Sequence, residues 1–232
     1  MNRGDKAGEP NKQLRGDGEE FAAFVDDPSF PCLGAKAALN SGSYRIETYN
    51  RLADPVSTKE LAVALESFQK SELRQKNDYA TFIAIFREPR ESSEEEFEKL
   101  LWSQLQQLHA IDRERYSWDP SVSSNLSDPY FSFSFAGKAL YVIGMHPNSS
   151  RLARRFPRAA LIFNPHEQFE RLRHDGKWAH LREVIRQRDV ALQGSANPML
   201  ADFGEASEAR QYSGRAVDES WEPEGGRCPF GH

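Results

Sequence analysis

The segment from Phe131 to Gly144 constrains the fold of this chain more than any other. Phe131, Phe133 and Phe135 alternate with small residues, a Gly-Lys turn follows, and an apolar run then continues to Gly144. Two strands joined by so short a turn pair in antiparallel fashion. We therefore expect an α+β fold, a single domain with a mixed or antiparallel sheet flanked by helices, rather than a doubly wound parallel sheet.

Further strands and helices are indicated by the spacing of apolar residues. Strands are expected at 44–49, 79–86 and 159–163. Helices are expected at 58–74, 94–113 and 177–192, with another that begins at Asn164-Pro165 and a short basic one after Ser149-Ser150. Ser57 and Ser93 each precede a glutamate by three residues, which is typical of a capping box.

Composition favours one domain and excludes several classes of partner. A chain of 232 residues that are 38% hydrophobic can bury its own core. Residues 1–18 are polar and without periodicity, so we expect a disordered tail followed by a single domain at 19–232. A net charge of −5 gives no basic footprint for nucleic acid. No leader or apolar span is visible, so we expect a cytoplasmic protein without a membrane partner.

Two histidines stand at junctions between a strand and a helix. His146 ends the second strand of the hairpin and is followed by Arg151, Arg154 and Arg155, while His166 lies in the first turn of the next helix. A neutral imidazole could ligate a metal, and the arginines could hold carboxylates. A packing role for either histidine, and a solvated helix face for the arginines, remain open alternatives.

A long loop and two cysteines complete the candidate features. The loop, residues 194–214, mixes apolar residues with charged ones, which favours a functional role over a linker. Cys32 and Cys228 are far apart and each adjoins a proline, which is no disulfide framework. Either both are structural, or one has chemistry. The Cys228-Pro229 pair could provide a thiolate to haem, and a disordered tail is equally compatible with it.

Motifs that are absent exclude other chemistries. The chain has no Cys-x-x-Cys-His segment for covalent haem attachment and no Glu-x-x-His for a di-iron helix pair. It also lacks the glycine-rich loops that bind phosphate.

Several segments, in this order, resemble the YqcI/YcgG family from roughly Phe21 to the C-terminus. They are Phe30-Pro31-Cys32 with Gly34-Ala35-Lys36, Met145-His146-Pro147, Ser149-Ser150-Arg151, Phe163 to Phe169, Ile185 to Asp189, Leu192 to Ser195, Asn197-Pro198, Asp202-Phe203-Gly204, Ser207 to Tyr212 and Cys228-Pro229-Phe230. The family includes haemoproteins that hydroxylate nitrogen atoms of arginine or related guanidino amino acids.

The resemblance implies a haem-dependent N-oxygenase that acts on arginine or a related guanidino amino acid. Its cofactor would be haem b and its oxidant dioxygen. An external electron donor, such as a separate reductase, is required because the chain contains no reductase module, and a homodimer is compatible with this function. The alternative is a haem-binding or haem-sensing protein without turnover.

The residues can be assigned to the roles that such an enzyme needs. His146 is the first choice for the iron ligand, His166 the second and Cys228 the third, with Arg151 and Arg155 holding the haem propionates. His166 and Asp189 are the expected catalytic residues. A guanidinium needs a carboxylate, and the amino-acid end needs a cation. The substrate-binding candidates are Asn197, Arg210 and the carboxylates of Asp189, Asp202, Glu205 and Glu208.

Overall fold

The computed structural model describes residues 12–218, 220–223 and 230. Within them, one five-stranded sheet has the order β1-β2-β5-β4-β3. Its strands are β1 (Tyr44–Arg51), β2 (Thr81–Glu88), β3 (Phe133–Phe135), β4 (Lys138–Met145) and β5 (Ala159–Pro165). β1 is parallel to β2, and the other neighbours are antiparallel. The predicted α+β fold with a mixed sheet is therefore confirmed, including the β3–β4 hairpin.

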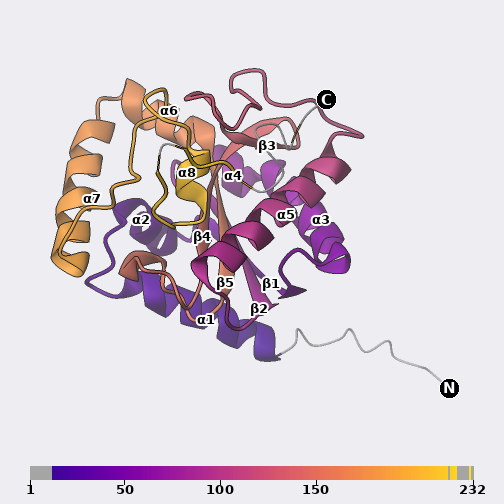
Figure 1. The fold of residues 1–232 in the computed structure, drawn as a ribbon, viewed down its shortest axis with the longest axis horizontal. Coiled ribbons are helices and arrows are strands. Elements are labelled where there is room, and N and C mark those ends of the chain that lie inside the picture. Colours follow the sequence, from indigo (N-terminus) through magenta and orange to yellow (C-terminus); the bar gives the residue numbers. More distant parts are fainter. Residues whose placement is uncertain (1–11, 219, 224–229, 231–232) are drawn as a thin grey trace.

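Helices cover both faces of this sheet (Figure 1). They are α1 (Lys12–Asp26), α2 (Leu33–Ser41), α3 (Pro55–Gln69), α4 (Glu72–Lys76), α5 (Glu94–Asp112), the 3-10 turn η1 (Leu152–Arg154), α6 (His166–His174), α7 (Trp178–Gln193) and α8 (Ala209–Tyr212). In the view of Figure 1, α3 and α5 lie to the right of the sheet, and α2 and α7 lie to its left. None of the helices in the described ranges is both long and apolar enough to cross a membrane.

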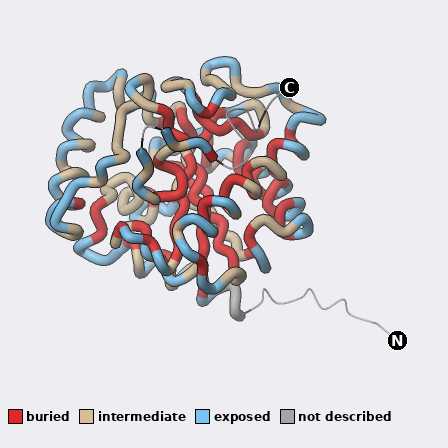
Figure 2. Tube along the Cα trace, viewed as in Figure 1, coloured by how far each residue is buried: buried red, intermediate tan, exposed pale blue. Residues whose placement is uncertain are grey.

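The core has two parts because the central strands are buried on both faces. Phe82 and Phe86 of β2 belong to the larger cluster under α3 and α5, whereas Ile83 and Ile85 belong to a smaller cluster under α1. This two-sided burial explains why β2 is a continuous apolar run rather than an alternating one. Figure 2 shows the buried residues concentrated in the sheet and its covering helices, with a mostly exposed or half-buried α7 at the periphery.

The N-terminal part differs from the expected disordered tail. α1 begins at Lys12, and Asp17 in its middle is 5% exposed. The Asp17 carboxylate pairs with Arg87 at 3.4 Å and with Arg158 at 3.1 Å. Long-range ion pairs, which no local periodicity reveals, thus accompany helical structure in residues 12–18. Residues 1–11 lie outside the described residues.

Helix starts were predicted correctly for α5 and to within one residue for α7, and wrongly for others. Ser93 and Glu96 form the expected capping box at α5. The helix predicted at 58–74 instead starts at Pro55, because Asp54 accepts hydrogen bonds from the next N–H groups, and it is divided into α3 and α4. Asn164 does not cap α6, since it belongs to β5 and its amide donates to the Tyr141 carbonyl. Helix α2 was not predicted.

Asp112, at the end of α5, is a buried carboxylate that holds the β3–β4 turn. It accepts a hydrogen bond of 2.8 Å from the Ala136 N–H. Burial raises the pKa of Asp112 from 3.8 to about 6, helped by the Glu66 charge and opposed by the Ala136 hydrogen bond. Because the folded state binds this proton more tightly than the unfolded state, the contribution to stability is complete below about pH 4 and is lost as the pH rises through about 6.

Asp112→Asn is accordingly expected to stabilise the protein at high pH. The variant keeps an acceptor for Ala136 and removes the buried charge, so the free energy of unfolding should rise by about 1–3 kcal/mol near pH 8 and change little near pH 4. Urea unfolding at both pH values measures this. Asp119→Asn is a matched control, because hydrogen bonds from Ser121 and Ala139 outweigh burial and lower the pKa of Asp119. That control should be destabilised near pH 8, and equal effects of Asp112→Asn at both pH values would contradict the argument.

Candidate functional site

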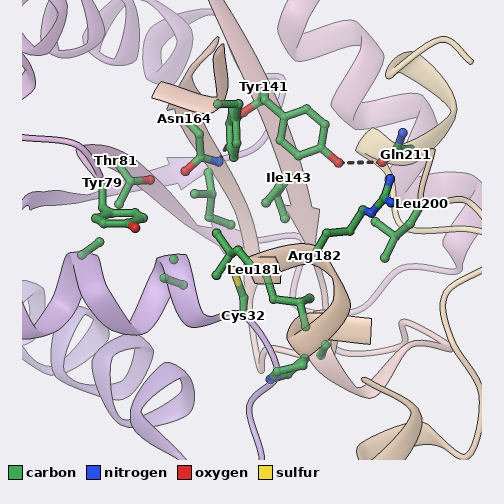
Figure 3. A pocket seen from close by; sticks show the side chains of 18 of the residues that line it. Cys32, Tyr79, Thr81, Tyr141, Ile143, Asn164, Leu181, Arg182, Leu200 and Gln211 are labelled. Carbon is green, nitrogen blue, oxygen red and sulfur yellow. Dashed lines mark hydrogen bonds between the residues drawn. The ribbon is translucent and has the colours of Figure 1, made fainter. Parts of the chain in front are cut away.

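A cavity of about 260 Å³ lies between the sheet and helices α1, α2, α6 and α7 (Figure 3). Apolar side chains supply most of its wall, among them Phe21, Val25, Phe30, Ile83, Ile143, Met145, Ile162, Phe169, Leu181 and Ile185. The long loop contributes Asn197, Leu200, Asp202, Phe203 and Glu208 to the same wall. The loop therefore lies against the cavity, while its role in binding a substrate stays a prediction.

The thiol of Cys32 lies in this apolar wall at the N-terminal end of α2. Cys32 is the N-cap residue of that helix and follows Pro31. Burial raises the pKa of the Cys32 thiol, whereas the Ala35 and Gly34 N–H groups and the Arg154 charge lower it. A metal ion deprotonates a coordinating thiol outright, so burial does not prevent this sulfur from acting as a ligand. No histidine of the described residues lines the cavity.

Arg154 is a buried cation in the cavity wall without a carboxylate partner among the described residues. Its guanidinium donates to the carbonyls of Gly144, Gln211 and Tyr212. These contacts hold η1 against β4 and α8, so Arg154 has a structural role in addition to its charge. Burial lowers its pKa, although the guanidinium still carries its charge at neutral pH. Arg154 therefore gives the cavity wall a buried positive group that a ligand anion could neutralise, beside Arg173, Arg182 and Arg186, which also line the cavity.

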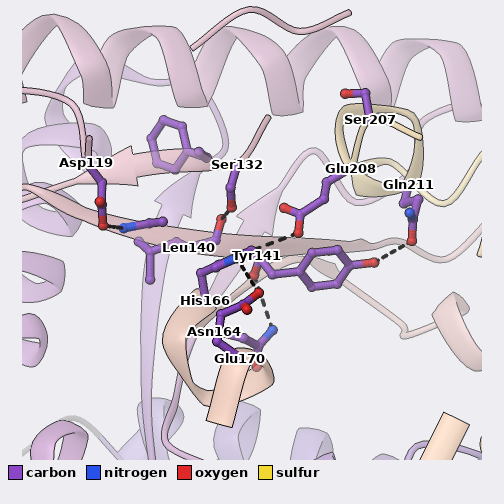
Figure 4. A network of polar contacts seen from close by, with 12 residues as sticks. Asp119, Ser132, Leu140, Tyr141, Asn164, His166, Glu170, Ser207, Glu208 and Gln211 are labelled. Atoms are coloured by element: carbon purple, nitrogen blue, oxygen red, sulfur yellow. Dashed lines mark hydrogen bonds and ion pairs between the residues drawn. The ribbon is translucent and has the colours of Figure 1, made fainter. Parts of the chain in front are cut away.

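Glu208 is the corresponding carboxylate on the loop side. The residue is 5% exposed, lines the cavity and accepts a hydrogen bond of 3.2 Å from the Tyr212 hydroxyl. Within the described part of the chain, no lysine or arginine forms an ion pair with it. Its ionic contact is instead with His166, whose Nδ1 lies 3.5 Å from Glu208 Oε1 (Figure 4).

The other carboxylates of the wall already have cationic partners. Asp189 pairs with Arg151 at 2.5 Å and accepts the Asn197 N–H. Asp202 pairs with Arg182 and accepts a hydrogen bond from the Trp178 indole. Because a paired carboxylate offers less to an incoming cation, Glu208 is the better candidate for holding one.

His146, the first choice for an iron ligand, lies on the other face of the sheet. Successive residues of a strand point to opposite faces, and Met145 faces the cavity. The His146 ring stacks on Phe97 of α5 with its centroid at 4.5 Å, and its Nδ1 is buried without a hydrogen-bond partner. Burial lowers the pKa of His146. This placement favours a neutral packing residue.

Arg151, Arg155 and Arg210 do not line the cavity, and the polar groups of the other candidates already have partners. Arg151 is occupied by Asp189 and the Ser195 carbonyl, and Arg155 donates to the Ser149 carbonyl. Arg210 donates to the Val217 carbonyl and does not line the cavity. Asn197 lines the cavity, but its side-chain oxygen accepts the Met199 N–H within the loop. Cys228 lies outside the described residues. No group of three or more potential metal ligands occurs among the described residues.

Sequence reasoning missed the roles now open to Cys32 and Arg154. Both had visible signals: Cys32 belongs to the Phe-Pro-Cys segment, and Arg154 to the basic cluster. Neither signal shows which side chain of its segment points into a cavity. That choice depends on the helices that pack against the sheet.

Fold and site together define an α+β protein with an apolar cavity whose wall carries a thiol, a buried cation and a buried carboxylate. The YqcI/YcgG family model matches residues 21–231, so the chain belongs to the YqcI/YcgG family. It is 29% identical over 210 residues to the uncharacterized protein YqcI of Bacillus subtilis strain 168, covering 87% of this chain and 80% of YqcI. No solved structure matches the chain.

Proposed function

We propose that this protein is a haem-dependent N-oxygenase that acts on arginine or a related guanidino amino acid. The observation that carries the proposal is the Cys32 thiol at a helix N-terminus, inside an apolar cavity that also contains the buried Arg154 guanidinium. A thiolate is one of the axial ligands that haem iron takes in proteins, and an apolar surround and a cation for a propionate also suit a haem. Family membership supports the same chemistry.

The residue types in the cavity wall suit a haem, but the cavity is too small for one. Haem binding would therefore require part of the wall to move. The cavity volume of about 260 Å³ lies below the roughly 300–1,000 Å³ of ordinary ligand sites. Helix α7 is the wall best able to move outward, because Asp189 is its only buried residue. Cys32 would bind the iron, and Arg154 and Arg186 would hold propionates. Arg186 donates only to the Leu200 carbonyl among the described residues and also lines the cavity.

The chain's own residues would bind and orient the substrate. Haem, when bound, supplies the activation of dioxygen, with electrons from an external donor. Glu208 would pair with the substrate guanidinium, because it is buried and has no lysine or arginine partner in the described ranges. The apolar loop residues Leu200 and Phe203 would exclude water around that ion pair and so strengthen it.

An absorption spectrum and a turnover assay test this function. Full-length protein produced with a haem supply is expected to show a Soret band that shifts on addition of L-arginine. With a chemical reductant and dioxygen, it should also form a product heavier than arginine by one oxygen atom, as seen by mass spectrometry. A Soret band without arginine-dependent oxygen consumption would favour a haem-binding or haem-sensing protein. Absence of the band at saturating haem would overturn both functions.

A further inference from the structure

Three side chains, Glu208, His166 and Glu170, connect the cavity wall with the protein surface (Figure 4). Glu208 and His166 are each 5% exposed. The side chain of Glu170 is 51% exposed and lines a second pocket of about 430 Å³. An ionisable path thus runs from a buried carboxylate through an imidazole to a carboxylate in contact with solvent.

The two ring nitrogens of His166 face the two carboxylates. His166 and Glu170 are four residues apart on α6 and so lie on the same helix face, with Nε2 at 3.2 Å from Glu170 Oε1. Nδ1 lies 3.5 Å from Glu208 Oε1 and is buried without a hydrogen-bond partner. The shorter contact favours a proton on Nε2, which leaves the Nδ1 lone pair open toward Glu208. Phe203 packs its ring against the imidazole at 4.4 Å and holds this orientation.

Among the groups around Glu208, His166 is the one that can carry a proton from it toward the surface. Arg173 pairs with Glu170 at the outer end. At the cavity end of this path, the Tyr212 hydroxyl donates to Glu208. The charge of Glu208 also acts electrostatically on Tyr141. Burial raises the pKa of both tyrosines, so each keeps its proton at neutral pH. Tyr212 stabilises the Glu208 carboxylate, whereas the Tyr141 hydroxyl donates to Gln211. Neither can carry a proton away from Glu208 as a phenolate.

We propose that Glu208, His166 and Glu170 form a proton relay between a bound guanidinium and solvent, an inference that rests on the proposed function. A guanidinium stays protonated at neutral pH and has no nitrogen lone pair free for oxygen transfer, so a base must take one proton. Glu208 takes that proton and passes it to His166 Nδ1, while the proton on Nε2 moves to Glu170 and then to water. The net change is one proton moved from the cavity to solvent and a change of imidazole tautomer, with no change in oxidation state.

The contacts are tested on the full chain as purified, without haem. The titration of His166 is followed by NMR of protein with labelled histidine. One carboxylate oxygen lies within 3.5 Å of each ring nitrogen, so Glu208→Gln and Glu170→Gln should each change the His166 ring resonances and their dependence on pH. Glu167→Gln is the matched control on α6, because that carboxylate is 41% exposed and pairs with Arg74 instead. An unchanged His166 titration in both relay variants overturns the proposal.

Turnover of the haem-loaded enzyme provides the second readout. His166→Gln and Glu170→Gln should lower kcat by on the order of 100-fold, leave KM for L-arginine within about twofold and increase the solvent deuterium isotope effect. Glu167→Gln should retain the wild-type kcat. A wild-type kcat in both relay variants overturns the relay while leaving the proposed function intact. If the haem-loaded wild-type protein does not turn over L-arginine, the proposed function is overturned and the relay with it.

Discussion

Replacing Cys32 with alanine is expected to abolish the Soret band of the haem-loaded protein or to shift it strongly. The reason is that Cys32 offers a thiolate inside the cavity, whereas no histidine of the described residues lines it. Loss of the axial ligand removes the principal bond to the iron and changes its spectrum. The measurement is an absorption spectrum at equal protein and haem concentrations, with circular dichroism to show that the variant is folded.

Three variants serve as comparisons for Cys32→Ala. Cys228→Ala removes the second cysteine and should leave the spectrum unchanged. His146→Ala should also preserve the spectrum, because the ring packs on Phe97 on the other face of the sheet. His166→Ala should keep the haem as well. If His146→Ala loses the Soret band and Cys32→Ala retains it, then the ligand first expected from the sequence is the right one and the assignment to Cys32 fails.

Glu208→Gln is expected to weaken the binding of L-arginine by on the order of 2 to 5 kcal/mol, which is about 30-fold to several thousand-fold in Kd. The variant leaves a guanidinium in a buried site without its charged partner, and the amide cannot replace a bidentate carboxylate. Haem content should not change, since Glu208 is not placed at the iron. Titration of L-arginine, followed by the shift of the haem spectrum, measures the loss.

Two controls separate this effect from a general loss of negative charge. Glu205→Gln changes an exposed carboxylate of the same loop and should alter the affinity by under about 1 kcal/mol. L-citrulline, which has a neutral urea group in place of the guanidinium, should bind wild type and Glu208→Gln with similar affinity. An unchanged arginine affinity in Glu208→Gln would move the guanidinium site elsewhere. Asp202→Asn is then the next variant, although its pairing with Arg182 makes a smaller effect the expected one.

The amino-acid sequence by itself determined the elements whose pattern is local. The α5 stripe and its capping box, the β3–β4 hairpin and the apolar run of β2 each depend on residues within one segment, and all three were predicted. The boundaries of α3 and α4 were less accessible, because Asp54-Pro55 and Ser71 compete with Ser57 as starts.

Only the tertiary structure decided which of the candidate side chains meet. Met145 and His146 are neighbours in the chain, yet one faces the cavity and the other packs under α5. A strand buried on both faces carries no amphipathic pattern, so its sequence does not indicate which helices cover which face. The proximity of Cys32 to Arg154, and of His166 to Glu208, likewise follows from the packing of segments that are far apart in the sequence.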